Sequence, residues 1–199
     1  MTHTTGPTRG EGFASRAGVK LDAALTSFGV DPAGLTCADL GCSTGGFTDC
    51  LIQRGAQRVY AVDTAYGELA WKLRQHDRVT VLERTNALHF DPREELEGFT
   101  GADLVSIDLG WTKQQRAIPA AIRWLKRDHD QPVGDVIALI KPHYESGQHK
   151  LDDDEAERIA REVAVGLEDD HVKLGGVIAS PVRGGKGKNL EFLTHIKVR

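Results

Sequence analysis

Short apolar segments that alternate with helical segments constrain the fold of this chain more than any other feature. Segments 35–40, 58–62, 79–82, 103–107 and 133–140 are short and apolar, which is typical of strands buried in a parallel sheet. Apolar residues at helical spacing precede the first of these segments and follow most of the others, so we expect helices that include 68–75 and 113–127. This alternation predicts an α/β fold, in which helices cover both faces of a mostly parallel sheet.

The C-terminal part of the chain departs from this alternation. Segment 152–167 has the pattern of a further helix, but only a loop separates the last two expected strands, 171–180 and 190–198. Two strands with only a loop between them pair antiparallel or skip a crossover, and we expect one reversed strand near the C-terminal edge of the sheet. A chain of 199 residues suits one such domain, over 15–199, after a flexible polar leader at 1–14 that lacks the apolar region of a secretory signal.

The composition narrows the class of protein. Hydrophobic residues make up 40% of the chain and charged residues 27%, and no apolar run approaches the roughly 18 residues that span a membrane. We therefore expect a cytoplasmic protein without membrane contact. The three cysteines form no CxxC pair and the eight histidines lack ligand spacing. This pattern favours reduced thiols and no metal site over a disulfide framework.

Charge is unevenly distributed along the chain. The net charge of −4 argues against strong nonspecific binding of nucleic acid. Segment 113–127 nevertheless carries five basic and no acidic residues, whereas segment 151–170 carries nine acidic and two basic residues. Segment 171–199 is basic again. This segregation permits a basic side that faces RNA, with segments 113–127 and 183–188 as candidate phosphate contacts.

A glycine-rich run at 39–47, Asp-Leu-Gly-Cys-Ser-Thr-Gly-Gly-Phe, follows the first expected strand. Ligands of open α/β sheets bind beyond the carboxyl ends of the strands, and glycine lets the backbone approach a ligand closely. Asp63 ends the second strand, about twenty residues further on, where a carboxylate can accept hydrogen bonds from ribose hydroxyls. The run therefore predicts a site for a cofactor that contains a nucleoside.

The same run argues against two other nucleotide sites. A dinucleotide GxGxxG motif needs glycine at position 43, which is Ser, and a phosphate-binding loop needs a GK[ST] ending that is absent. Asp39, two residues before Gly41, suits the ammonium of a methionine group better than a pyrophosphate. A glycine-rich turn without a ligand is the alternative.

Several motifs in order resemble those of one family. The chain is similar to the FtsJ-like ribose 2′-O-methyltransferases, and most closely to the TlyA-type rRNA methyltransferases that were labelled haemolysins. The resemblance covers residues 15–198. The motifs are Ser15-Arg-Ala-Gly-x-Lys20-Leu, Asp39-Leu-Gly-x-Ser-Thr-Gly-Gly-Phe-Thr-Asp49, Val59-Tyr-Ala-Val-Asp63, Glu83-Arg-Thr-Asn86-Ala, Lys141-Pro-x-x-Glu145 and Ser180-Pro-x-x-Gly-x-x-Gly-x-Asn189-x-Glu191-Phe-Leu.

The resemblance implies a Rossmann-like class I fold that binds S-adenosylmethionine and methylates RNA. The cofactor residues that the resemblance implies lie in or shortly after the first four expected strands. They are Asp39, Gly41, Ser43, Thr44, Gly45, Gly46, Phe47, Asp63, Asn86 and Asp108.

The resemblance also implies a catalytic tetrad of Lys20, Asp108, Lys141 and Glu191 that acts on a ribose 2′-hydroxyl. In this hypothesis Lys141 deprotonates or orients the hydroxyl, and Lys20 supplies a neighbouring positive charge. Asp108 positions Lys141, and Glu191 orients the two lysines. Taken singly, three of them have an ordinary alternative: a solvated lysine at Lys20, a helix cap at Asp108, or at Glu191 a charge that protects an edge strand.

Three features depart from the family pattern. TlyA-type proteins carry an N-terminal S4 RNA-binding domain, for which residues 1–14 are too few. Residues 109–112 read Leu-Gly-Trp-Thr where Ser-Phe-Ile-Ser is usual after the aspartate, and residues 143–144 read His-Tyr where Gln-Phe is usual. Trp111 is placed to stack on a substrate base or to serve as a partly buried anchor. A methyltransferase of small molecules or proteins, and a non-catalytic RNA-binding protein, therefore stay as alternatives.

Overall fold

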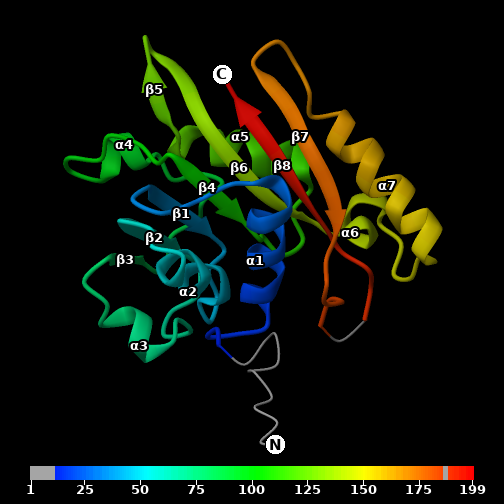
Figure 1. The fold of residues 1–199 in the computed structure, drawn as a ribbon, viewed down its shortest axis with the longest axis horizontal. Coiled ribbons are helices and arrows are strands. Elements are labelled where there is room, and N and C mark those ends of the chain that lie inside the picture. Colours follow the sequence, from blue (N-terminus) through cyan, green and yellow to red (C-terminus); the bar gives the residue numbers. More distant parts are fainter. Residues whose placement is uncertain (1–11, 186–187) are drawn as a thin grey trace, which may run out of the picture.

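A computed structural model describes residues 12–185 and 188–199, so most of the expected leader lies outside the described residues. The chain forms an eight-stranded sheet in the order β3-β2-β1-β4-β6-β8-β7, and β5 pairs with β6 off this path (Figure 1). The strands are β1 (Thr36–Leu40), β2 (Arg58–Val62), β3 (Val79–Leu82), β4 (Leu104–Ile107), β5 (Lys126–Asp128), β6 (Gln131–Ile140), β7 (Val172–Ala179) and β8 (Phe192–Val198). The helices are α1 (Ala17–Phe28), α2 (Gly46–Gln53), α3 (Trp71–Arg74), α4 (Pro92–Glu95), α5 (Gln114–Trp124), α6 (Pro142–Ser146) and α7 (Asp153–Val165).

The strand directions confirm the expected sheet. Strands β3, β2, β1, β4 and β6 are parallel to one another, whereas β8 runs antiparallel to both β6 and β7. The reversed strand therefore lies one position inside the edge. Its start faces the end of β6, where Phe192 pairs with Ile140.

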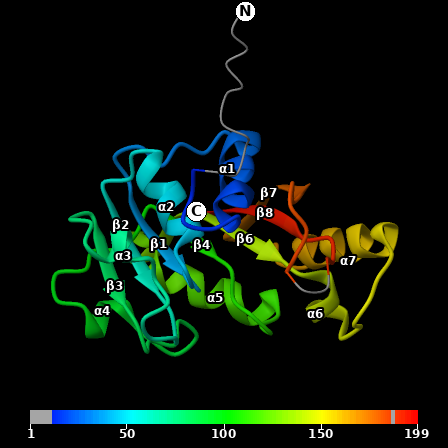
Figure 2. The same cartoon turned by 90° about the horizontal axis from the view of Figure 1, so that it is seen from below.

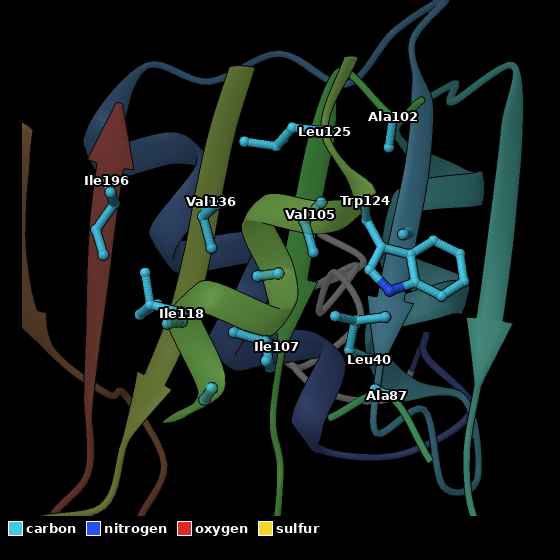
Figure 3. Packing of buried hydrophobic residues seen from close by; sticks show 14 of the residues in the cluster. Leu40, Ala87, Ala102, Val105, Ile107, Ile118, Trp124, Leu125, Val136 and Ile196 are labelled. Atoms are coloured by element: carbon cyan, nitrogen blue, oxygen red, sulfur yellow. The ribbon is translucent and has the colours of Figure 1, made fainter. Parts of the chain in front are cut away.

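Helices cover both faces of the sheet (Figure 2). On one face, α1 and α2 pack Leu21, Leu25 and Leu51 against the strands. On the other face, the apolar side of α5 packs against the central strands, as the labelled side chains in Figure 3 show. Trp124 at the end of α5 is fully buried, and its ring lies 5.8 Å from that of Phe90 and 5.5 Å from that of Phe99. Apolar residues of α7 cover the C-terminal edge of the same face.

Some expected boundaries were wrong. The helix expected over 113–127 ends at Trp124, because Lys126–Asp128 turn back as β5 and pair with the start of β6. His129 and Asp130, both with positive φ, form the two-residue connection that suits such a hairpin. The helix expected over 68–75 is only the short α3, and neither α4 nor α6 was expected.

The topology brings the ends of several strands to one edge of the sheet. Gly41, Asp63, Asp108 and Lys141 directly follow β1, β2, β4 and β6. Because β8 is reversed, Glu191, which directly precedes it, lies at the same edge. Within the described part of the chain, no helix has both the length and the apolar character to cross a bilayer.

Candidate active site

The four residues of the expected tetrad line one cavity of about 470 Å³. Lys20 comes from α1, Asp108 and Lys141 follow β4 and β6, and Glu191 precedes β8. They are distant in sequence, and the shared edge of the sheet brings them together. The expectation that they gather in one place is confirmed at the level of geometry, whereas their chemical roles stay a prediction.

The tetrad residues form two ion pairs. Lys20 Nζ lies 2.5 Å from Glu191 Oε2, and Lys141 Nζ lies 2.5 Å from Asp108 Oδ1. Lys20 is 7% exposed and Glu191 4% exposed, so neither is a solvated surface charge. Glu191 also does not protect an edge strand, since β8 is flanked by β6 and β7. A buried ion pair is a weak source of stability because removing both charges from water is costly, so a functional role for this pair is the better explanation.

Asp108 is likewise not a helix cap. Helix α5 begins after Lys113, and the backbone N–H of Gln114 donates to Glu145 Oε1 at 2.8 Å. The carboxylate of Asp108 is instead directed at Lys141. The ordinary explanations of Lys20, Asp108 and Glu191 therefore do not describe this arrangement.

The β7–β8 connection closes over Glu191. The backbone N–H of Ser180 donates to Glu191 O at 2.8 Å, and that of Gly184 donates to Asn189 O at 2.9 Å. A Cβ on Gly184 would lie 2.5 Å from Glu191 Oε1. Glycine at this position therefore leaves the space that the Glu191 carboxylate occupies.

A second cavity, of about 360 Å³, lies at the glycine-rich turn. Five of the expected cofactor residues line it, and Asp108 lines both cavities, so the two adjoin. These five residues are Gly41, Ser43, Asp63, Asn86 and Asp108. Its wall also contains Thr64, Thr85 and Thr112, which the sequence analysis missed, although Thr85 lies within the quoted Glu83–Ala87 motif.

The polar groups of this cavity suit a nucleoside. Asp63 accepts backbone hydrogen bonds from Ser43 and Ala65, both at 2.8 Å, which fixes its carboxylate while leaving lone pairs for other donors. The Oδ1 of Asn86 accepts from the Leu88 N–H at 3.0 Å, so its amide NH₂ stays available to a ligand. Gly41 has φ +89°, and a Cβ there would collide with the backbone carbonyl of Asp108. Only glycine at position 41 therefore lets the turn pack against the backbone of Asp108.

The other five expected cofactor residues do not line this cavity. Thr44 is exposed, and Gly45, Gly46 and Phe47 are buried at the start of α2. Gly46 lets α2 approach α1, because a Cβ there would lie 2.9 Å from that of Ala17. Their contact with a cofactor stays a prediction.

Asp39 is fully buried beneath the turn. Its carboxylate accepts hydrogen bonds from Thr48 Oγ1 at 2.7 Å and Ser106 Oγ at 3.1 Å. Burial raises the pKa of Asp39 to about 7, although these two hydrogen bonds act in the opposite direction. The geometry favours a carboxyl group that supports β1, α2 and β4 over one that meets a ligand directly.

Aromatic residues surround the tetrad cavity, where the sequence departs from the family pattern. Trp111 is 83% exposed, so it is not a partly buried anchor. Its ring stacks on Tyr144 with centroids 4.6 Å apart and planes at 26°. His143 also lines this cavity, in agreement with the interpretation that the changes at 143–144 line the substrate side, and so does Asn189, which sequence reasoning did not place there. Burial lowers the pKa of His143, which favours its neutral form.

The two basic segments differ in how many of their basic side chains already form ion pairs or hydrogen bonds within the protein. In segment 113–127, Arg123 donates to Leu88 O at 2.7 Å and Lys126 pairs with Asp103 at 2.6 Å, whereas Lys113 and Arg116 are exposed. In segment 183–188, Arg183 pairs with Asp153 at 2.5 Å, and residues 186 and 187 lie outside the described residues. Binding of RNA by these segments stays a prediction.

Comparison with known sequences identifies close relatives. The FtsJ-like methyltransferase family matches residues 13–191. The chain is 37% identical over 194 residues to the 16S/23S rRNA (cytidine-2′-O)-methyltransferase TlyA of Mycobacterium tuberculosis, covering 94% of this chain and 69% of that protein. It is 32% identical to Hemolysin A of Brachyspira hyodysenteriae, covering 92% of this chain and 76% of the relative. YqxC of Bacillus subtilis, named as a candidate rRNA methyltransferase, is 35% identical, and the chain spans 65% of its length.

Solved structures agree with these relationships. A candidate hemolysin from Lactococcus lactis superposes with a TM-score of 0.82 at 33% identity, covering 94% of this chain and 88% of that one. The fibrillarin/Nop5p complex superposes with a TM-score of 0.57 at 15% identity, over 83% of this chain and 73% of the other, which shows a shared fold alone.

Proposed function

The chain belongs to the FtsJ-like methyltransferase family, and we propose that it transfers a methyl group from S-adenosylmethionine to a ribose 2′-hydroxyl of ribosomal RNA. The observation that carries this proposal is the meeting of Lys20, Asp108, Lys141 and Glu191 in one cavity. That cavity adjoins the one at the glycine-rich turn through Asp108. Relatives named as rRNA methyltransferases support the choice of RNA.

We assign the cofactor to the cavity at the glycine-rich turn. Asp63 would accept hydrogen bonds from the ribose hydroxyls, and Asn86 would contact the adenine. The backbone at Gly41 and Ser43 would pass beside these groups. Asp108, at the border with the tetrad cavity, would face the methionine end. When bound, S-adenosylmethionine supplies a methyl group on a positively charged sulfur, which is a good leaving group. The cavity's carboxylates and amide match the donors and the positive charge of such a ligand.

We assign the handling of the 2′-hydroxyl to Lys141. Its Nζ orients the hydroxyl oxygen and takes the proton that this oxygen loses as it bonds to the methyl carbon. A lysine accepts a proton only as a neutral amine, so the Lys141–Asp108 ion pair corresponds to the state after the proton has moved. Asp108, 2.5 Å from Nζ, then stabilises the ammonium that forms. Asp108 thereby also fixes the direction of the Lys141 side chain.

Lys20 and Glu191 form the opposite side of this arrangement. The Lys20 ammonium provides a second positive charge in the cavity and helps to hold the anionic RNA. Glu191 accepts from Lys20 at 2.5 Å and keeps that ammonium in place. Exposed Lys113 and Arg116, close in sequence to Thr112 of the cofactor cavity, are candidates for phosphate contacts.

The test replaces Lys141 and follows the methyl group. Wild-type protein, Lys141→Ala and a control, Lys173→Ala, are incubated with ribosomal RNA and cofactor carrying a labelled methyl group. Lys173 is an exposed lysine near the start of β7, at the far edge of the sheet. Mass mapping of ribose methylation should detect product with wild type and control, and a loss of at least about 100-fold with Lys141→Ala.

Three results would contradict the proposal. Wild-type turnover by Lys141→Ala would refute the role of that lysine. Methylation of a base, a protein or a small molecule in place of ribose would refute the substrate. Cofactor binding without transfer to any RNA would favour a non-catalytic RNA-binding protein.

A further inference from the structure

A pocket of about 380 Å³ adjoins the tetrad cavity and shares no lining residue with the cofactor cavity. The two share Trp111, His143, Tyr144 and Asn189. The pocket is completed by Gly147, Gln148 and His149, which follow α6. Whatever occupies this pocket is therefore a direct neighbour of whatever occupies the tetrad cavity.

Aromatic rings form the wall that the two cavities share. Tyr144 stacks on Trp111, and its ring centroid lies 4.1 Å from that of His143. Trp111 holds φ +58°, a conformation that is costly for a bulky residue, and leaves its indole 83% exposed. Exposed aromatic faces bind flat, uncharged rings by stacking, and every nucleobase offers such a face.

The rest of the pocket is polar but carries no permanent charge. Among the described residues that line it there is no Lys, Arg, Asp or Glu. None of these described lining residues is a cation that would pair with a phosphate, which argues against the sugar–phosphate chain as occupant. Gln148, His149 and Asn189 offer both hydrogen-bond donors and acceptors, the groups that read the edge of a base.

The backbone keeps these polar side chains at the rim. Gly147 ends α6 in the left-handed conformation with φ +76°, and the Gln148 N–H donates to Ser146 Oγ at 3.2 Å. The side chains of Gln148 and His149 are exposed and make at most one weak internal hydrogen bond, from Gln148 Nε2 to Glu155 Oε1 at 3.5 Å. They are thus available to a ligand at little cost in internal contacts.

We propose that this pocket binds the nucleobase directly next to the methylated nucleotide, and that Gln148 and His149 set a sequence preference at that position. The proposal rests on RNA being the substrate of the tetrad cavity. It adds to the proposed function a second nucleotide subsite, on the opposite side of the Trp111–Tyr144 wall from the reacting ribose.

The kinetic test uses short RNAs that contain the mapped methylation site, with each base in turn, or an abasic sugar, on either side of it. With wild-type protein, an abasic neighbour on one side should lower kcat/KM by roughly tenfold through a higher KM, as expected for loss of one stacked base. The double variant Gln148→Ala/His149→Ala should lose the preference among the four bases and keep kcat at saturating RNA. The matched control, Gln57→Ala/His171→Ala, replaces exposed residues of the same types elsewhere and should behave as wild type.

A binding measurement separates this inference from the proposed function. If the pocket binds an uncharged base, dinucleoside monophosphates should quench the fluorescence of Trp111, measured as the difference between wild type and Trp111→Phe. The double variant should bind them more weakly. This readout does not require methyl transfer. Absence of quenching in the wild type, equal turnover of all neighbouring bases, or an unchanged preference in the double variant would each overturn the subsite. Failure of the wild type to methylate any RNA ribose, with quenching intact, would overturn the proposed function and, with it, the place of the pocket beside a methylated nucleotide, while binding of a base by the pocket would stand.

Discussion

Lys20 and Glu191 are the residues whose burial says most about the site. Both are nearly inaccessible, and each is the partner of the other at 2.5 Å. Removal of one partner leaves the other charge buried without compensation, which typically costs about 3–5 kcal/mol. We therefore expect Glu191→Ala to lower the free energy of unfolding by about this amount, as measured by urea denaturation.

The double variant Lys20→Met/Glu191→Leu is the control for this prediction. It removes both charges and should recover most of the lost stability, while methyl transfer stays absent. If Glu191→Ala were as stable as wild type, the ion pair would not be buried in the way the structure describes.

Asp39 gives a prediction for pH. Burial raises its pKa to about 7, whereas an unfolded chain has a value near 3.9. Between these values the folded state holds a proton that the unfolded state lacks, so this group's contribution to stability falls as pH rises from about 4 to about 7. At neutral pH the loss is at most about 4 kcal/mol, from the shift of some three units at about 1.4 kcal/mol each.

The variant Asp39→Asn isolates this effect. Its side chain does not titrate, so the difference in unfolding free energy, wild type minus Asp39→Asn, should decrease as pH rises from 4 to 7. Urea denaturation at intervals of one pH unit measures it. A difference that is constant over this range would show that Asp39 is not the buried titrating group.

At the residue scale, the sequence motifs predicted where the site lies better than they predicted which atoms its side chains contact. The meeting of these four residues could be predicted because the family resemblance names them, and because Asp108, Lys141 and Glu191 adjoin strands whose ends converge at one edge of the sheet. The surroundings of Asp39 could not be predicted in the same way, because spacing from Gly41 says nothing about the side of β1 to which its carboxylate points. Thr48 and Ser106, which surround it, come from α2 and β4, and only the packed sheet brings them together.

At the scale of elements, the connection after β4 is held by α6. The backbone N–H of Gln114, the first residue of α5, donates to Glu145 Oε1 at 2.8 Å, so Glu145 caps this helix. The side chain of Gln114 donates from Nε2 to Leu139 O at 2.9 Å. The connection carries Asp108, and α6 directly follows Lys141. The Glu145 carboxylate therefore acts on the Asp108–Lys141 pair through the elements that carry the two residues.

We expect Glu145→Ala to lower kcat by about tenfold with an unchanged affinity for the cofactor, and to cost about 1 kcal/mol of stability from the lost cap. Glu145→Gln retains a carbonyl oxygen that can accept from Gln114 and should recover most of the activity. Glu157→Ala, on the exposed side of α7, is the control for removal of a glutamate. Equal kcat for Glu145→Ala and wild type would show that the cap does not position the pair.

The elements themselves differ in how far the sequence predicts them. Buried strands such as β2 and β3 were placed correctly because branched apolar runs end at polar residues. Helix α5 was extended too far, because the two-residue hairpin at His129–Asp130 contains no glycine to mark it. Helices α4 and α6 are four and five residues long, too short for helical periodicity to be visible.

For the whole molecule, the segregation of charge decides how an acidic protein could bind RNA. Acidic residues of α7, at the C-terminal edge of the sheet, form ion pairs with basic residues of the same helix, as in Arg158–Glu162 and Arg161–Glu157. The exposed Lys113 and Arg116 instead lie at the start of α5, which follows the site edge. The total of −4 is therefore a poor guide to the field at the cavities.

This arrangement predicts the salt dependence of RNA binding. Each phosphate contact adds roughly 0.7–0.9 to the negative slope of log K against log salt concentration, because bound counterions are released. Lys113→Ala/Arg116→Ala should reduce that slope by about one to two, as measured by equilibrium binding to ribosomal RNA fragments between 50 and 200 mM salt. The control Arg58→Ala/Lys173→Ala removes two exposed cations from the opposite edge of the sheet and should leave the slope unchanged. An equal change in both variants would mean that RNA is attracted by net charge and not by the edge that carries the site.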